Sequence, residues 1–155
     1  MTLNHIAKVS VAAFLALAGM AASADTQSLA VSAAVKDVCT FTPGVVAMDF
    51  GTLDPSAAAD TPGTLTGAVS YKCTKGTTPG TLSADNGANF SVKRRMSNGT
   101  DFLPYTLSLS AATAGAGFGA GKEQAVTLTA GVLGADYVNI SKGAYSDSVT
   151  LTVAP

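Results

Sequence analysis

Short segments of alternating apolar and polar residues, separated by glycine, proline and asparagine, run through most of this 155-residue chain. A strand with one buried face has this two-residue period, whereas an amphipathic helix repeats every 3.6 residues. Thr, Ser, Val, Ala and Gly dominate, Glu occurs once and Trp is absent, which is a composition typical of strands and turns. Six or seven strands at this spacing predict an all-β antiparallel sandwich in a single domain.

The expected strands after residue 36 are short, and turn-forming residues separate them. They cover residues 38–42, 45–50, 65–73, 89–96, 102–110, 124–133, 137–140 and 148–153. Asn98-Gly99 is the strongest hairpin signal in the chain. Residues 54–63 and 111–121 are expected to be loops, and Ala57–Ala59 favours a helical turn within the first of them.

The first 24 residues have the features of a secretory signal peptide. Lys8 precedes an apolar run over residues 9–22, and Ala22-Ser23-Ala24 fits the small-residue pattern of a cleavage site. Cleavage is therefore expected between Ala24 and Asp25. No later stretch approaches the ~20 apolar residues of a membrane-spanning helix. The mature chain is predicted to be exported and to contain no membrane span.

Residues 27–35 form an alternating segment with no evident partner. Leu29, Val31, Ala33 and Val35 lie on one side of the extended chain. No two-residue hairpin turn follows, so pairing with the nearest neighbour is not evident. Residues 25–36, here called the N-terminal arm, are predicted to be a free strand that another molecule accepts. The alternative is an edge strand of the chain's own domain, and this pattern alone leaves both open.

Cys39 and Cys73 are the two cysteines of the chain. An even pair in an exported protein indicates one disulfide, and the alternative is two free buried thiols. Closing a loop of about 35 residues stabilises a fold by roughly 3–4 kcal/mol in the chain-entropy model.

Charge and residue content argue against several function classes. Lys8 lies in the predicted leader, so eight Lys and Arg remain against ten Asp and Glu, a net charge of about −2. This balance gives no electrostatic case for binding nucleic acid or anionic membrane. The single histidine, His5, also lies in the leader, so the mature chain lacks an imidazole base or metal ligand. No catalytic site, cofactor or metal is expected, and the chain is predicted not to be an enzyme.

Two groups of charged residues remain as candidates for a site. Asp49 with Asp54, or Asp85 with Asp101, could form carboxylate pairs, but solvated turn aspartates are the favoured interpretation. The run Lys93–Arg95 lies on a predicted strand, where alternate residues face opposite ways. A solvated or salt-bridged strand face is favoured there over a ligand site.

Several short motifs follow one another along the mature chain. They are Cys39-Thr40-Phe41, Asp49–Leu53, Val69–Cys73, Arg95-Met96 with Asn98-Gly99, Leu103–Leu107 and Gly143–Val149. In this order and spacing they resemble the spore coat protein U family, the archaic (sigma-type) chaperone–usher pilins. By analogy with immunoglobulin-like sandwiches, the Tyr145 hydroxyl could bond backbone across a connection, or Tyr145 is simply a buried aromatic.

The resemblance implies an immunoglobulin-like sandwich that lacks its last strand, over residues 37–155. In this family the N-terminal strand of each subunit fills the groove of the next, by main-chain pairing with alternate side chains in pockets. Leu29, Val31, Ala33 and Val35 are then the donor side chains. The implied partners are copies of this chain or related pilins, a periplasmic chaperone and an outer-membrane usher.

The expected function is therefore that of a structural pilin subunit in a cell-surface fimbrium that serves attachment and biofilm formation. One alternative is a self-contained secreted surface or coat protein whose N-terminal strand completes its own sandwich. A carbohydrate-binding tip adhesin is the third reading. The absence of Trp and a length too short for an extra domain argue against it.

Overall fold

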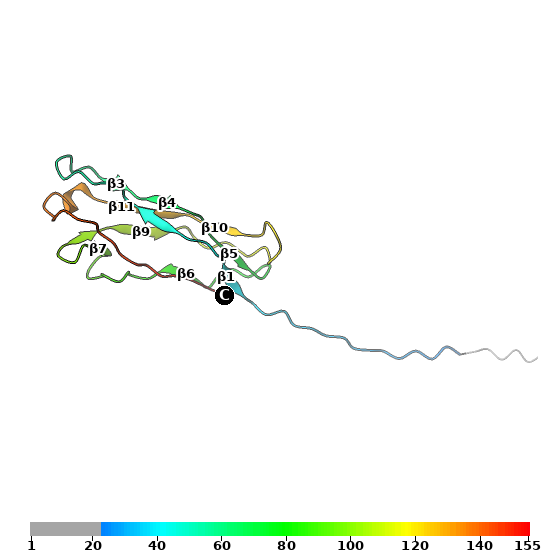
Figure 1. The fold of residues 1–155 in the computed structure, drawn as a ribbon. Helices are drawn as coiled ribbons and strands as arrows, with labels where there is room; N and C mark the ends of the chain where they lie inside the picture. Colours follow the sequence, from blue (N-terminus) through cyan, green and yellow to red (C-terminus); the bar gives the residue numbers. More distant parts are fainter. Residues whose placement is uncertain (1–22) are drawn as a thin grey trace, which may run out of the picture. The chain divides into compact units, whose positions relative to one another are not determined.

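The computed structural model describes residues 23–155, which fold into strands and connecting loops (Figure 1). The predicted signal peptide falls almost wholly on residues 1–22, outside the described residues. One short 3-10 helix, η1, covers Gly134–Asp136. The strands are β1 (Cys39–Phe41), β2 (Ala47–Asp49), β3 (Thr61–Pro62), β4 (Thr64–Thr66), β5 (Val69–Cys73), β6 (Thr81–Ala84), β7 (Arg95–Ser97), β8 (Phe102–Pro104), β9 (Thr106–Leu109), β10 (Gln124–Val126), β11 (Leu128–Val132) and β12 (Leu151–Ala154).

The first layer of the fold is a set of antiparallel ladders. β1 pairs with one edge of β5, and β10 pairs with the other edge. β2 pairs with β4. β11 lies between β3 and β9 and pairs with both. The expected strand 65–73 is thus interrupted. Gly67 adopts a φ of +85° there, and a side chain at this position would collide with the Val45 carbonyl. Because of this interruption, β4 pairs with β2 in one register and β5 pairs with β1 in another.

The second layer contains β12 paired with β6 and the hairpin of β7 and β8. Upstream of β12 the pairing continues, because Thr150 and Ser148 accept backbone bonds from Asp85 and Ala88. Ser146 then bridges to Ser97 on β7. All these pairings are antiparallel, as expected for a sandwich built from short connections. The predicted Asn98-Gly99 hairpin is confirmed, with four residues between the paired ends Ser97 and Phe102.

The core lies between the two layers. Alternate residues of β5 are buried, and Tyr71 is only 1% exposed. Leu82, Leu151 and Val153 of the second layer pack against this cluster of the first layer. A second cluster is centred on Leu103, Val132 and Tyr137, and Phe50, Leu53, Met96, Tyr105, Ile140 and Tyr145 pack against it. The all-β prediction and the sandwich interpretation both hold.

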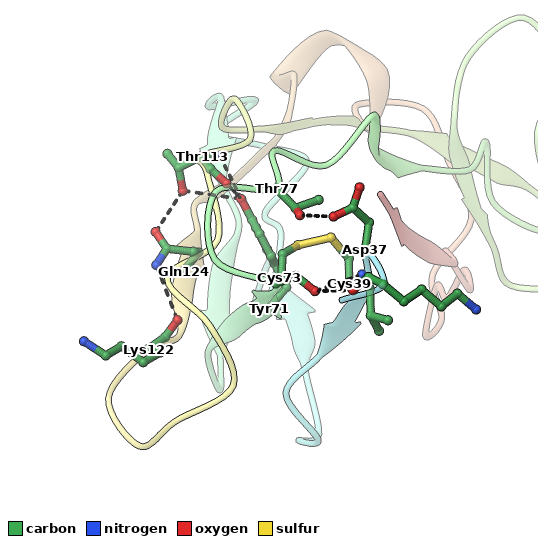
Figure 2. Close-up of a disulfide and its surroundings, with 11 residues drawn as sticks. Asp37, Cys39, Tyr71, Cys73, Thr77, Thr113, Lys122 and Gln124 are labelled. Atoms are coloured by element: carbon green, nitrogen blue, oxygen red, sulfur yellow. Dashed lines mark hydrogen bonds between the residues drawn. A yellow bond between two sulfur atoms is a disulfide. The ribbon is translucent and has the colours of Figure 1, made fainter. Parts of the chain in front are cut away.

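The expected disulfide between Cys39 and Cys73 is confirmed, and it joins the first residue of β1 to the last residue of β5 (Figure 2). Loop 111–121 covers it. A side chain at Gly115 would lie 2.5 Å from the Cys73 Cβ, so the loop backbone packs directly on the bridge. The Tyr71 hydroxyl donates to the Thr113 carbonyl and accepts from its amide, both at 2.7 Å. The loop is therefore fixed to the core from two sides.

Two predicted strands were wrong in whole or in part, and one strand was missed. Residues 89–94 form no ladder, because side chains take up their backbone groups: Asp147 accepts from the Asn89 amide at 3.2 Å. Residues 137–140 are not a strand either. Gly134 lies against the Ala58 carbonyl, which leaves no room for a side chain, and the chain makes a 3-10 turn there. β6 was not predicted, because its four residues carry only one large apolar side chain, Leu82.

The N-terminal arm is extended and makes no ladder within the described residues. Leu29 and Val31 are each 85% exposed, and Val35 is 84% exposed. The chain divides into two structural units between Ala33 and Ala34. These apolar side chains thus lack the buried face that their alternation predicts.

Candidate functional site

A groove opens between the two layers on one side of the sandwich. One wall is the segment Val46–Phe50, which includes β2, and the other wall is the segment Tyr145–Leu151, which leads into β12. The groove section between them has a volume of about 420 Å³. Its floor is formed by Leu65, Met96, Tyr105, Leu107, Leu128 and Ala130. Most of these side chains are apolar, so the groove exposes part of the core.

A larger cavity of about 720 Å³ continues the groove beyond Tyr145. The two sections share Met48, Phe50, Met96 and Tyr145. The ring of Phe50, which lines both sections, lies 6.1 Å from the ring of Tyr105 in the smaller one. We call the two sections together the open groove.

The wall beside β12 presents an unpaired strand edge to the open groove. Ser146, Ser148 and Thr150 use their backbone groups to pair with the second layer. Because backbone groups alternate in direction along a strand, those of Asp147 and Val149 point the other way. In the described part of the chain neither residue has a backbone hydrogen bond. The edge can therefore accept one further strand.

Asp147 is the one charged side chain among the described residues that line the 420 Å³ section. Its Oδ2 accepts from the Tyr105 hydroxyl at 2.8 Å, and its Oδ1 accepts from the amide and side-chain nitrogens of Asn89. Burial, together with this bond to a carboxylate, raises the pKa of Tyr105 above its ordinary value. Both oxygens of the carboxylate are thus engaged within the protein, which leaves the groove suited to apolar side chains.

Tyr145 begins the wall of the open groove and fixes its position. Its hydroxyl donates to the Ser141 carbonyl at 2.7 Å, four residues upstream. This bond to the backbone just before a strand is the one expected by analogy with immunoglobulin-like sandwiches. Burial raises the pKa of Tyr145, and nearby Asp101 adds to the effect.

The candidate carboxylate pairs are turn aspartates, as predicted. Asp49 and Asp54 each accept the amide two residues ahead, and Asp101 accepts from the Ser141 amide. Asp85 accepts from the Gly87 and Thr150 amides. These bonds hold the pKa values of Asp54, Asp85 and Asp101 below the ordinary range. Across residues 23–155 no three His, Cys, Asp or Glu side chains gather in a way that could hold a metal ion.

The basic run Lys93–Arg95 is largely structural. Arg94 donates to the carbonyls of Ala84, Asp85 and Leu107. Arg95 donates to the Asn89 carbonyl at 2.6 Å, and its guanidinium lies 3.8 Å from the centre of the Phe102 ring. Backbone carbonyls, rather than the carboxylates of a salt bridge, are therefore the partners of both arginines in the described structure.

The residues that line the groove could not be predicted as one site from the sequence, although the alternating side chains of the arm could be. The two walls were visible in the sequence as the alternating residues Val46, Met48 and Phe50, and Val149, Leu151 and Val153. Nothing in either segment shows that the two face one another. Only the arrangement of the layers reveals this.

The model of the Spore Coat Protein U domain matches residues 25–152. The chain belongs to the spore coat protein U family. No match is found among curated proteins or among solved structures. The family's domain is a structural, pilin-type domain associated with fimbrial subunits of the chaperone–usher route, and its members are surface fimbrial or coat proteins. Nowhere between residues 23 and 155 is there a helix of the length and apolarity needed to cross a membrane.

Proposed function

We propose that this spore coat protein U domain is a structural pilin subunit that polymerises by donating its N-terminal arm to the open groove of another copy. The observation that carries the proposal is the pairing of two incomplete features in one chain. The arm has an apolar face with nothing packed on it, and the groove has an apolar floor beside an unpaired strand edge.

The strand arrangement supports this proposal. The first layer has the order of the four-stranded immunoglobulin sheet, with β1 and β2 at one edge and β9 at the other. The second layer has β6 beside β12, as in the three-stranded sheet, and its third strand would lie on the open side of β12. That position is the edge of the open groove.

The dimensions of the arm and the groove also agree. From Leu29 to Val35 an extended chain spans about 20 Å, at ~3.3 Å per residue. The wall from Tyr145 to Leu151 contains the same number of residues. An inserted arm would pair with the free edge and direct Leu29, Val31, Ala33 and Val35 into the floor, which is β-augmentation.

The proposed pathway follows from the exposed groove. An apolar groove and a free strand edge promote aggregation, so a periplasmic chaperone occupies the groove until an outer-membrane usher adds the subunit to a surface fibre. Such a fibre serves attachment and biofilm formation. In the alternative function, a secreted coat protein, the arm fills the groove of its own domain.

A matched pair of charge substitutions tests the proposal. In Val31→Asp a charge enters an apolar pocket without a partner, at a cost of at least several kcal/mol, against roughly 1.5–3 kcal/mol gained by burying one apolar side chain. In Ser32→Asp the charge lies on the opposite face of the arm. We expect Val31→Asp to abolish the ladder of polymers in unheated denaturing electrophoresis, and Ser32→Asp to retain it.

The outcomes separate the two functions. Capture of both variants by the chaperone would show that the groove itself is intact. Equal assembly of the two variants would contradict strand donation, and a wild-type chain that runs only as a monomer would favour the self-contained coat protein.

A further inference from the structure

The ladder between β1 and β5 ends at the disulfide, yet the chain before it remains attached to the domain. Cys39 is paired with Cys73, and beyond Cys73 the chain turns away. The Thr77 amide donates to the Thr74 carbonyl within this turn, and Gly76 has a φ of +87°. The last main-chain bond of the ladder is donated by the Thr74 amide to the Val38 carbonyl, at 2.9 Å. Among the described residues, the other backbone groups of residues 36–38 have no main-chain partner.

Two threonine hydroxyls replace the missing strand. Thr74 Oγ1 accepts from the Val38 amide at 3.1 Å and donates to the Lys36 carbonyl at 3.0 Å. Thr77 Oγ1 donates to Asp37 Oδ1 at 2.7 Å, beside the disulfide (Figure 2). Lys36, the last residue of the arm, and Asp37 and Val38, which lie between the arm and β1, are thus each held by a side chain of the turn. We call Thr74 and Thr77 the threonine clamp.

The turn that carries the threonine clamp is itself fixed. Gly76 and Thr77 exchange backbone hydrogen bonds with Gly115, at 2.9 and 2.8 Å. The Gly117 amide donates to the Cys73 carbonyl at 3.0 Å. The clamp therefore rests on loop 111–121 and on the disulfide rather than on a free loop.

The hydrogen bonds stop at Lys36. Within the described residues, no hydrogen bond joins residues 23–35 to any other part of the chain. The apolar side chains of Val35 and Val31 are almost fully exposed. The boundary between the fixed and the free part of the chain falls between Val35 and Lys36.

We infer that Thr74 and Thr77 are positioning residues that make Val35 the last side chain the arm can donate and fix the direction in which the arm leaves its domain. This inference rests on the proposed function. Because the Val38 amide and the Lys36 carbonyl are already bonded, they cannot join a ladder in a neighbour. The donated segment cannot slip toward the domain, and no flexible linker separates consecutive subunits in the fibre.

Amide hydrogen exchange on the purified chain, as polymer or as monomer, tests the clamp itself. Thr74→Val removes the hydroxyl with little change of shape, whereas Thr74→Ser keeps it and serves as the control. We expect exchange at the Val38 amide to rise roughly five- to tenfold in Thr74→Val, the effect of losing one hydrogen bond. Exchange should be unchanged in Thr74→Ser. Equal exchange at the Val38 amide in Thr74→Val and Thr74→Ser would overturn the clamp.

Electron microscopy of fibres tests whether the threonine clamp fixes the angle between consecutive subunits. In a Thr74→Val/Thr77→Val variant we expect the spread of angles between consecutive subunits to widen at least twofold, with polymers still formed. An unchanged spread would overturn the positioning role. These results are independent of the pair Val31→Asp and Ser32→Asp, which tests whether the arm is donated at all.

Discussion

The sandwich has two sides where its layers meet, and they differ in one respect. On one side β6 and β9 come together, and the guanidinium of Arg94 bonds to Ala84 and Asp85 at the end of β6 and to Leu107 in β9. On the other side, β2 and the segment before β12 stand apart around the open groove. On the first side, here called the closed side, the bonds of Arg94 join the two layers. On the other side, here called the open side, the backbone groups of Asp147 and Val149 have no partner among the described residues, and apolar side chains line the groove.

This difference between the two sides shows that the open groove does not result from poor packing throughout the sandwich. The same layers that separate at β2 are joined across the opposite side by the guanidinium of Arg94. The wall of the open side is also well fixed, because Tyr145 and Asp147 are anchored by their side chains. A rigid wall with a free edge is suited to accept a strand without first being remodelled.

The largest effect is expected from closing the open side within one chain. A copy of residues 25–36 fused after Pro155 through a flexible linker would bury Leu29, Val31 and Val35, worth roughly 5–9 kcal/mol before ordering costs. We expect a rise in melting temperature of roughly 10–20 °C, which thermal denaturation measures. A fused copy with Asp in place of Val31 is the control. Equal melting of the two fusions would show that the open side does not accept the arm.

Removing the disulfide should affect the open side next most strongly. The bridge ties β1, which continues into the groove wall, to the centre of the first layer. Replacing Cys39 and Cys73 by Ser should lower the free energy of unfolding by roughly 3–4 kcal/mol. Chemical denaturation measures the loss. Alkylation of the native, unreduced protein should label neither cysteine, and uptake of two alkyl groups would contradict the bridge.

On the closed side, Arg94→Ala should cost roughly 2–3 kcal/mol, because buried or half-buried carbonyls lose a charged donor. Arg94→Lys should recover only part of this, since one ammonium cannot reach both strands. If the two sides are independent, Arg94→Ala should lower the free energy of unfolding by the same amount with and without the fused arm. A double-mutant cycle measures this, and a large coupling energy would show that the two sides respond to one another.

The smallest effect concerns pH. Hydrogen bonds from Thr150 and Gly87 lower the pKa of Asp85, and those from Ser141 lower the pKa of Asp101. Because the folded pKa values lie below the unfolded ones, this stabilisation is present above about pH 4 and is lost as the pH falls through the folded values. Asp85→Asn keeps an acceptor oxygen and should flatten the decline of stability below about pH 4. A decline of unchanged slope would exclude Asp85 as a source.

Much of this molecule could be predicted from its sequence because the signals are local. The two-residue period of residues 45–50 and 148–153 gave strands close to β2 and β12, and the cysteine pair gave the bridge. The expectation of turn aspartates was right because an Asx turn depends on neighbouring residues only. The predicted strand over residues 89–96 was right only at its end, in β7, because Asp147, more than fifty residues away, binds the backbone of Asn89.

By itself, the sequence determined that the chain is all-β, that one disulfide crosses it, and that the N-terminal arm carries an apolar face. The strands and the face of the arm depend on a two-residue period among neighbouring residues, and the bridge could be predicted because the chain has only two cysteines. Tertiary structure alone decided that Val46–Phe50 faces Tyr145–Leu151 across the open groove, and that Arg94 closes the opposite side. It also placed Thr74 and Thr77 against the root of the arm. These contacts join segments far apart in the chain, and which segments meet depends on how whole layers pack.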